Sequence, residues 1–248
     1  MTSFRAWLCT LKVYTQPASL RMLALGFSAR LPLLLVLGTL SFWLREAGID
    51  RTTIGYLSWV GLAYAFKWVW APLVDRLPLP GLTRRLGRRR SWLLLSQLLI
   101  AAGLLGMASQ NPQLALTPMV WSALVVAFGS ATQDIALDAY RIESASMQEQ
   151  AALAATYQTG YRLAMIWAGA GVLWVATLAQ GEQLGYAVRA WQVAYSVMAA
   201  CMVVGIVTVL LSPEPQPRPL PPSRSVQEWL HSALVAPFAD FIARYRWQ

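Results

Sequence analysis

The chain has 248 residues, of which 57% are hydrophobic and only 12% are charged. A soluble globular domain carries about 25% charged residues, so the composition excludes an ordinary soluble domain and predicts a multi-pass membrane protein. The formal net charge of +9 does not indicate a nucleic-acid partner, because the cations cluster between apolar segments instead of covering a soluble surface.

Apolar residues form six segments that are each long enough to cross a bilayer, for which roughly 20 residues are needed. The first of these runs is longer than the core of a signal peptide, so we expect it to remain as a helix. The sequence therefore predicts an all-α membrane protein with a six-helix transmembrane bundle over residues 1–212, whose spans cover residues 20–44, 53–74, 91–109, 118–141, 151–179 and 190–211.

The first two spans contain charged residues within apolar surroundings. Arg30 lies in the first span, two residues before Pro32, which cannot donate a backbone hydrogen bond and predicts a kink. Asp50, in the following loop, is placed to cap the start of the second span. In that span Lys67 lies two turns before Asp75, close enough to the inner end for its ammonium group to extend to the membrane surface.

The loop between the second and third spans, residues 75–90, is the most highly charged part of the chain. With the six spans assigned, fourteen Lys and Arg residues lie on the side of this loop and three on the opposite side. Because membrane proteins carry an excess of Lys and Arg in their cytoplasmic loops, the sequence predicts that both termini are cytoplasmic.

The fourth span contains two carboxylates. Asp134 and Asp138 are four residues apart, so they share one helix face with Ser130. A charged residue in hydrocarbon costs about 2.5–3.5 kcal/mol, so this face is expected to line the bundle interior or a water-filled cavity. For Asp138 an alternative is that it reaches the membrane surface or pairs with Arg141, because it lies near the cytoplasmic end of the helix.

The fifth span carries Arg162, about three turns from its cytoplasmic end and on the same helix face as Gln158. At this depth a cation is expected to pair with an acid inside the protein, and Asp134 is the first candidate. Intramembrane charges of this kind serve as proton relays and substrate sites. We therefore predict that Asp134 or Asp138 carries a proton, while Arg162 holds the carboxylates or a substrate anion.

The composition changes abruptly after the last span, and residues 213–248 are predicted to form a separate unit. Its proline-rich start, residues 212–223, predicts an extended, semi-rigid linker. Ser225 and Glu228 then have the spacing of a helix capping box. The apolar stripe that follows predicts an amphipathic cytoplasmic helix lying on the membrane surface, interrupted at Pro237.

The sequence gives little support for an enzyme. The only histidine, His231, lies in the tail, and no metal-ligand cluster, nucleophile–base pair or nucleotide phosphate-binding loop can be recognised. We therefore expect no metal and no cofactor. The alternative to a transporter is a non-transporting fragment or scaffold.

One group of residues resembles the G-x-L-x-D-R-x-G-R-R signature of the major facilitator superfamily. It consists of Asp75, Arg76, Gly87, Arg88 and Arg89. The match is imperfect, because the leading glycine is replaced and an insertion precedes Gly87.

Three longer segments are similar to AmpG-type muropeptide permeases. They are GFSARLPLLL, TIGYLSWVGLAYAFKWVWAPLVDR and SATQDIALDAYR, at residues 26–35, 53–76 and 130–141. One position departs from that family, since such permeases usually have glycine where this chain has Arg30.

The resemblance implies the N-terminal half of a major facilitator superfamily fold, which is a 3+3 inverted repeat of helices. It further implies a bacterial inner-membrane importer of anhydromuropeptides, which are cell-wall fragments, driven by proton symport. Such permeases are about twice as long. The expected partners are therefore membrane lipids and a second six-helix half or a second copy, and the chain as a monomer is expected not to catalyse uptake.

The candidate site residues fall into two sets. The gating loop is expected to consist of Asp75, Arg76, Gly87, Arg88 and Arg89. The candidate proton and substrate pathway consists of Asp134, Asp138, Arg162, Gln133, Gln158, Tyr161, Lys67 and Arg30.

Overall fold

The computed structural model describes residues 12–145, 149–216, 228, 231 and 235–244. This part of the chain consists of helices and connecting turns without a strand, so the predicted all-α fold class is confirmed. Of the predicted tail helix the structure describes mainly α14, Ala236–Arg244, which begins next to Pro237. Ser225 and most of the proline-rich linker lie outside the described residues.

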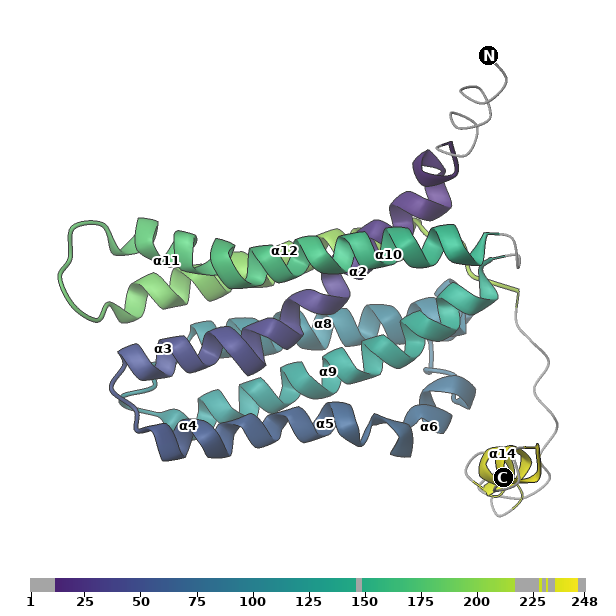
Figure 1. The fold of residues 1–248 in the computed structure, drawn as a ribbon, viewed down its shortest axis with the longest axis horizontal. Helices are drawn as coiled ribbons and strands as arrows, with labels where there is room; N and C mark the ends of the chain where they lie inside the picture. Colours follow the sequence, from purple (N-terminus) through teal and green to yellow (C-terminus); the bar gives the residue numbers. More distant parts are fainter. Residues whose placement is uncertain (1–11, 146–148, 217–227, 229–230, 232–234, 245–248) are drawn as a thin grey trace.

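Five continuous helical segments of the described chain are long and apolar enough to cross a membrane. They run alongside one another, and the chain reverses direction at the two ends of the bundle (Figure 1). The five segments are α2 to α3 (Pro17–Glu46), α8 (Arg88–Ala108), α9 (Leu116–Glu143), α10 to α11 (Gln150–Gln180) and α12 (Val188–Leu211). Each matches a predicted span.

The second predicted span, residues 53–74, is interrupted and is not one continuous helix. It consists of the short helices α4 (Arg51–Leu57), α5 (Leu62–Ala65) and α6 (Ala71–Arg76), joined by 3₁₀ turns. Glycine is a poor helix former, and proline lacks a backbone donor, so Gly61 and Pro72 favour these interruptions. The interrupted segment lies along α9 and completes the six elements of the bundle (Figure 1).

Two spanning segments contain a π-helical turn, at Leu35–Thr39 and at Trp167–Gly171. The first π-helical turn follows Pro32, the residue at which the sequence predicts a kink. The helix is continuous there and widens by one π-helical turn. Side-chain hydroxyls donate to backbone carbonyls at both turns. Tyr195 Oη donates to Leu35 O over 2.9 Å, and Thr39 Oγ1 donates to Ala168 O over 2.8 Å.

Glycines bring α2 (Pro17–Leu34) and α10 (Gln150–Ile166) into backbone contact. A side chain at Gly26 would collide with the Tyr157 carbonyl, and one at Gly160 would collide with the Leu23 carbonyl. Small residues at such positions allow membrane helices to approach closely. The contact fixes which face of α10 points towards α2.

The loop before α4 has the glycine turn and the helix cap that the sequence predicts. Gly48 has a φ of 81°, and Asp50 caps α4 by accepting a hydrogen bond from Thr53 N over 2.9 Å. The hydrogen bonds from Thr53 hold the pKa of the Asp50 carboxyl below its ordinary value.

We predict that Gly160→Ala destabilises the protein by about 1–3 kcal/mol, because the added methyl group forces apart two touching backbones. Gly55→Ala is the matched control, since nothing lies within 4 Å of a side chain at this helical position. It should be neutral or slightly stabilising because alanine is the better helix former. Thermal unfolding midpoints of the purified proteins in detergent measure both effects. Equal midpoints for the two variants would contradict the packing.

Candidate functional site

An ion pair between Lys67 and Asp134 joins the second and fourth elements of the bundle. Lys67 lies on the 3₁₀ turn between α5 and α6, and Asp134 lies on α9. Lys67 Nζ is 3.5 Å from Asp134 Oδ2, and the two side chains are 36% and 28% exposed. The interrupted segment thus places Lys67 against Asp134. The alternative, that the Lys67 ammonium group extends to the membrane surface, is not the arrangement seen in the structure.

The expected pair between Arg162 and Asp134 is wrong. Asp134 takes Lys67 as its partner, and no residue in the described part of the chain forms an ion pair with Arg162. Gly160 faces α2, and helical residues are about 100° apart around the axis, so Arg162 points away from that contact. Its side chain is exposed, as is that of Gln158.

Arg30 meets the ring of Tyr161 in the contact between α2 and α10. The Arg30 guanidinium carbon is 4.4 Å from the Tyr161 ring centroid, which is cation–π geometry. Its Nε atom is buried without a hydrogen-bond partner. The Tyr64 hydroxyl of α5 lies within electrostatic range of both Arg30 and Asp134. The structure therefore brings together four of the pathway candidates, namely Arg30, Lys67, Asp134 and Tyr161.

Two buried hydroxyls beside these charges have no hydrogen-bond partner in the described part of the chain other than one another. They are Tyr64 Oη and Ser130 Oγ, the latter one turn before Asp134 on α9. Buried polar atoms in proteins are normally hydrogen-bonded, so unpartnered groups of this kind mark a polar site in an apolar bundle. Asp134 and Asp138 can be recognised in the sequence because they are acids within an apolar span. A tyrosine in an apolar span is not unusual, so the sequence does not mark Tyr64 as a site residue.

Gln133 and Asp138 are not part of this group of contacts. Gln133 Nε2 and Gln97 Nε2 each donate to Ser28 Oγ over 3.3 Å, in the packed interior between α2, α8 and α9. Asp138 is exposed and pairs with Arg141 over 3.3 Å, which confirms the simpler alternative for that residue. Asp134 is therefore the carboxylate that combines depth with an interior partner.

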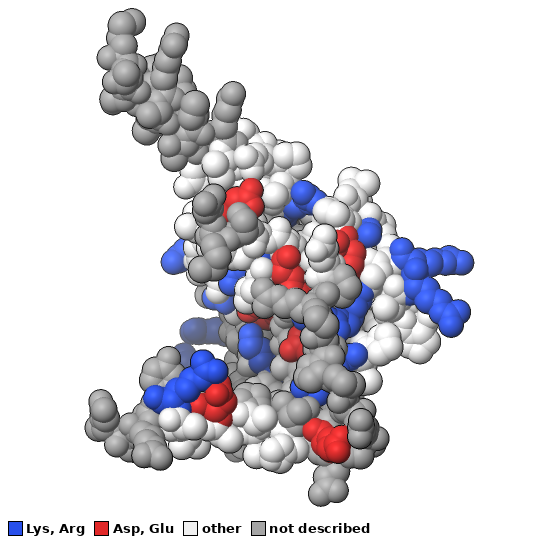
Figure 2. All heavy atoms as spheres, turned by 90° about the vertical axis from the view of Figure 1, so that its right-hand side faces the viewer, with Lys and Arg blue, Asp and Glu red and all other residues white. Residues whose placement is uncertain are grey.

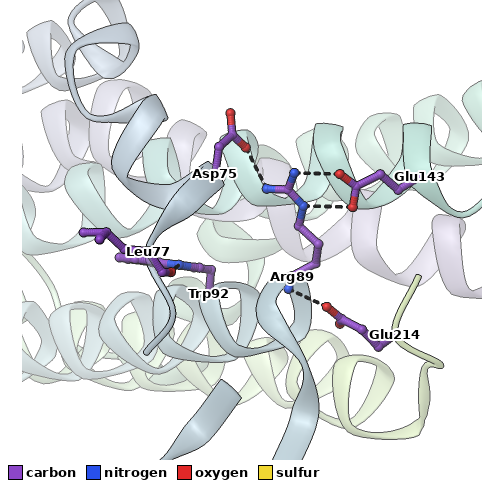
Figure 3. Close-up of polar contacts among 6 residues, drawn as sticks. All are labelled: Asp75, Leu77, Arg89, Trp92, Glu143 and Glu214. Atoms are coloured by element: carbon purple, nitrogen blue, oxygen red, sulfur yellow. Dashed lines mark hydrogen bonds and ion pairs between the residues drawn. The ribbon is translucent and has the colours of Figure 1, made fainter. Parts of the chain in front are cut away.

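A second cluster of charges lies at the end of the bundle where α8 begins and α9 ends. Figure 2 views this end, where Lys, Arg, Asp and Glu side chains gather. Arg89 is at its centre, with a side chain only 7% exposed. Arg89 Nη1 donates to Asp75 Oδ1 over 2.6 Å, while Nη2 and Nε donate to the two Glu143 oxygens over 2.7 and 3.0 Å (Figure 3). Arg89 thus joins the second, third and fourth elements.

Glu214 is the part of this cluster that sequence reasoning missed. Its carboxylate accepts hydrogen bonds from Arg89 N over 2.8 Å and Arg90 N over 3.1 Å, and so caps α8 (Figure 3). Gly87 permits this approach, because a side chain there would collide with Glu214 and its φ of 87° favours glycine. Glu214 belongs to a proline-rich segment, and no local signal predicts that it returns to α8.

The remaining gating candidates flank this network. Arg76 ends α6 and Arg88 begins α8, where its Nε atom is buried without a hydrogen-bond partner. Arg90 caps the C-terminal end of α12, where its guanidinium donates hydrogen bonds to Val209 O over 2.8 Å and to Leu210 O over 2.6 Å. Charge-assisted hydrogen bonds therefore fasten α8 to α6, α9 and α12 at one end of the bundle.

A model of the major facilitator superfamily matches residues 22–245. The chain belongs to the major facilitator superfamily. The anhydromuropeptide permease of Escherichia coli K12 is 40% identical over 234 residues, which cover 94% of this chain and 44% of the permease.

Two further relatives are similar to most of this chain. A putative transporter, AmpG 4 of Rickettsia conorii, is 33% identical over 94% of this chain and 54% of its own length. An uncharacterised protein of Haemophilus influenzae is 36% identical over 77% of this chain and 42% of its own. The predicted resemblance to AmpG-type permeases is confirmed, and the chain spans about half the length of the curated relatives it matches. This multi-pass membrane protein has relatives that indicate a transporter of the superfamily and not an enzyme.

We predict that Arg89→Gln destabilises the bundle by about 3 kcal/mol, because it leaves the nearly buried Glu143 carboxylate without its main cationic partner. Arg84→Gln, at an exposed position of the same loop, should change little. Adding Glu143→Gln to Arg89→Gln should recover part of the loss. Unfolding midpoints in detergent decide between these outcomes, and an Arg89→Gln midpoint equal to that of Arg84→Gln would contradict the network.

Proposed function

We propose that this chain is one six-helix half of a proton-coupled secondary transporter that imports anhydromuropeptides across the bacterial inner membrane. The observation that carries the proposal is the Lys67–Asp134 ion pair between the second and fourth elements. Acids and bases at this depth are costly and serve as proton relays or substrate sites in transporters. The superfamily match and the 40% identity to an anhydromuropeptide permease support the reaction class and the substrate.

In this proposal Asp134 carries the transported proton. When ionised, it attracts Lys67 and holds the interrupted segment against α9. Protonation removes that attraction, so the ion pair favours one arrangement of the two elements and the neutral acid favours another. Proton binding is thereby linked to the conformational equilibrium that alternating access requires.

The charged cluster around Arg89 is proposed to be the cytoplasmic gate. The fourteen Lys and Arg residues assigned to this side of the membrane support a cytoplasmic location for it and for both termini. Asp75, Arg89 and Glu143 fasten the ends of three elements. We propose that these contacts break and re-form as the transporter opens and closes towards the cytoplasm.

A second six-helix half is the partner that the proposed function requires. The substrate site of such transporters lies between two helix bundles near the middle of the membrane. Lys67 and Asp134 keep 36% and 28% of their side chains exposed, and Arg162 and Gln158 are exposed on α10. Charged groups facing lipid are costly, so these exposed polar groups favour a covering partner, either a second half or a second copy. A scaffold that recruits such a partner without transporting is the alternative function.

We predict that the chain reconstituted alone as a monomer shows no uptake of labelled anhydromuropeptide driven by a proton gradient. One bundle supplies only half of the substrate site. The same liposomes containing the chain fused to the C-terminal half of the Escherichia coli permease should accumulate the label. Single-molecule photobleaching establishes the copy number. Gradient-driven uptake by demonstrated monomers would refute the requirement for a partner, and failure of the fusion would favour the scaffold.

We further predict that Asp134→Asn in this fusion abolishes gradient-driven accumulation but retains exchange of labelled for unlabelled substrate. An amide keeps the shape of the side chain but cannot bind and release the proton. Asp138→Asn is the matched control and should retain at least half of the accumulation, because Asp138 is exposed and pairs locally with Arg141. Accumulation by Asp134→Asn equal to that of Asp138→Asn would overturn the assignment of the proton to Asp134.

A further inference from the structure

Arg30 is an arginine in the middle of a membrane-spanning segment. It lies 13 residues after Pro17 and 16 before Glu46, so at about 1.5 Å per residue it is roughly 20 Å or more from either end of the segment. Its side chain is too short to reach the membrane surface from that depth. A guanidinium placed there requires an anion or other polar groups inside the protein.

The described part of the chain provides no carboxylate that forms an ion pair with Arg30. Arg30 contacts the face of the Tyr161 ring, whose centroid is 4.4 Å from the guanidinium carbon, and its buried Nε atom has no hydrogen-bond partner among the described residues. The nearby acid, Asp134, already pairs with Lys67. The Asp134 carboxylate is therefore the nearby negative charge for both Lys67 and Arg30, so this region carries an excess of positive charge.

Two neutral groups complete the surroundings. The Tyr64 hydroxyl lies beside the Ser130 hydroxyl and near Arg30, and within the described part of the chain neither buried hydroxyl is hydrogen-bonded to any group other than its neighbour. Arg30 comes from α2, Tyr64 from α5 and Ser130 from α9. Three separate elements thus bring buried hydrogen-bonding groups with unused capacity towards the same positive region.

We propose that Arg30, held on the Tyr161 ring, is the binding subsite for a carboxylate of the transported ligand, with Tyr64 and Ser130 donating further hydrogen bonds. A guanidinium binds a carboxylate through two parallel hydrogen bonds, which a point charge such as lysine does not reproduce. The ligand class is a peptide that carries a free carboxylate. The inference rests on the proposed function in naming the substrate group that is recognised, but binding at Arg30 is measurable without transport.

The test compares a carboxylate with its neutral counterpart. Acetyl-alanyl-glutamate and its diamide are titrated into the purified chain in lipid nanodiscs, with binding followed by tryptophan fluorescence. Wild type should bind the carboxylate form at least tenfold more tightly than the diamide, and Arg30→Gln should lose this preference to within twofold. Arg30→Lys should retain only part of it. Arg45→Gln is the control, an exposed arginine at the outer end of the same spanning segment, and should behave as wild type.

Stability gives a second readout that does not depend on fluorescence. Because a half-buried cation without an ion-pair partner is costly within a membrane-spanning segment, Arg30→Leu should have a higher unfolding midpoint than wild type without the probe. The carboxylate probe should raise the midpoint of wild type and of Arg45→Gln, but not that of Arg30→Leu. Equal preference for carboxylate over diamide in wild type and Arg30→Gln, or no binding of the carboxylate by wild type, would overturn the inference.

The outcomes separate this inference from the proposed function. Muropeptide uptake by the fusion protein with an unchanged carboxylate preference in Arg30→Gln would refute the subsite and leave the transporter in place. Arg30-dependent carboxylate binding without muropeptide uptake would retain the subsite and refute the proposed substrate.

Discussion

The arrangement of this bundle depends on the high cost of placing charge in hydrocarbon. Lys67 and Asp134 meet that constraint by pairing across two elements, at 3.5 Å, where the second element is interrupted. A continuous helix presents its side chains at fixed angles, whereas the 3₁₀ turn at Lys67–Val69 changes those angles locally. The interruption and the ion pair therefore belong together, and Arg30 adds a second cation that the same acid does not neutralise.

Helix α9 connects the Lys67–Asp134 ion pair with the charged cluster around Arg89 at one end of the bundle. Asp134 and Glu143 are nine residues apart on this helix, which corresponds to roughly 13 Å along its axis. Glu143 is held by Arg89, which also contacts Asp75 at the end of the interrupted segment. The second and fourth elements are thus connected by ion pairs at two depths, by Lys67 with Asp134 and through Arg89 with Asp75 and Glu143. In our proposal, protonation of Asp134 breaks the first pair, and the contacts of Arg89 then have to hold these two elements together without it.

The sequence was sufficient for the features that depend on local properties. Hydropathy located the spanning segments, and the depth of Asp134 within an apolar run marked it as unusual. The partner of Asp134 was not predictable, because the face that α10 turns inward is set by the contact of Gly160 with α2, which is distant in sequence. Glu214 was missed for a similar reason, since a proline-rich segment gives no indication that its carboxylate caps α8.

The central claim is that Asp134 is the acid that gains and loses a proton within the membrane. Infrared difference spectroscopy of the lipid-reconstituted chain, recorded between two pH values, tests it directly. We expect the carbonyl band of protonated carboxyl groups to grow at the lower pH in wild type and Asp138→Asn, and to be weaker by the contribution of one carboxyl group in Asp134→Asn. An identical band in Asp134→Asn and wild type would contradict the account.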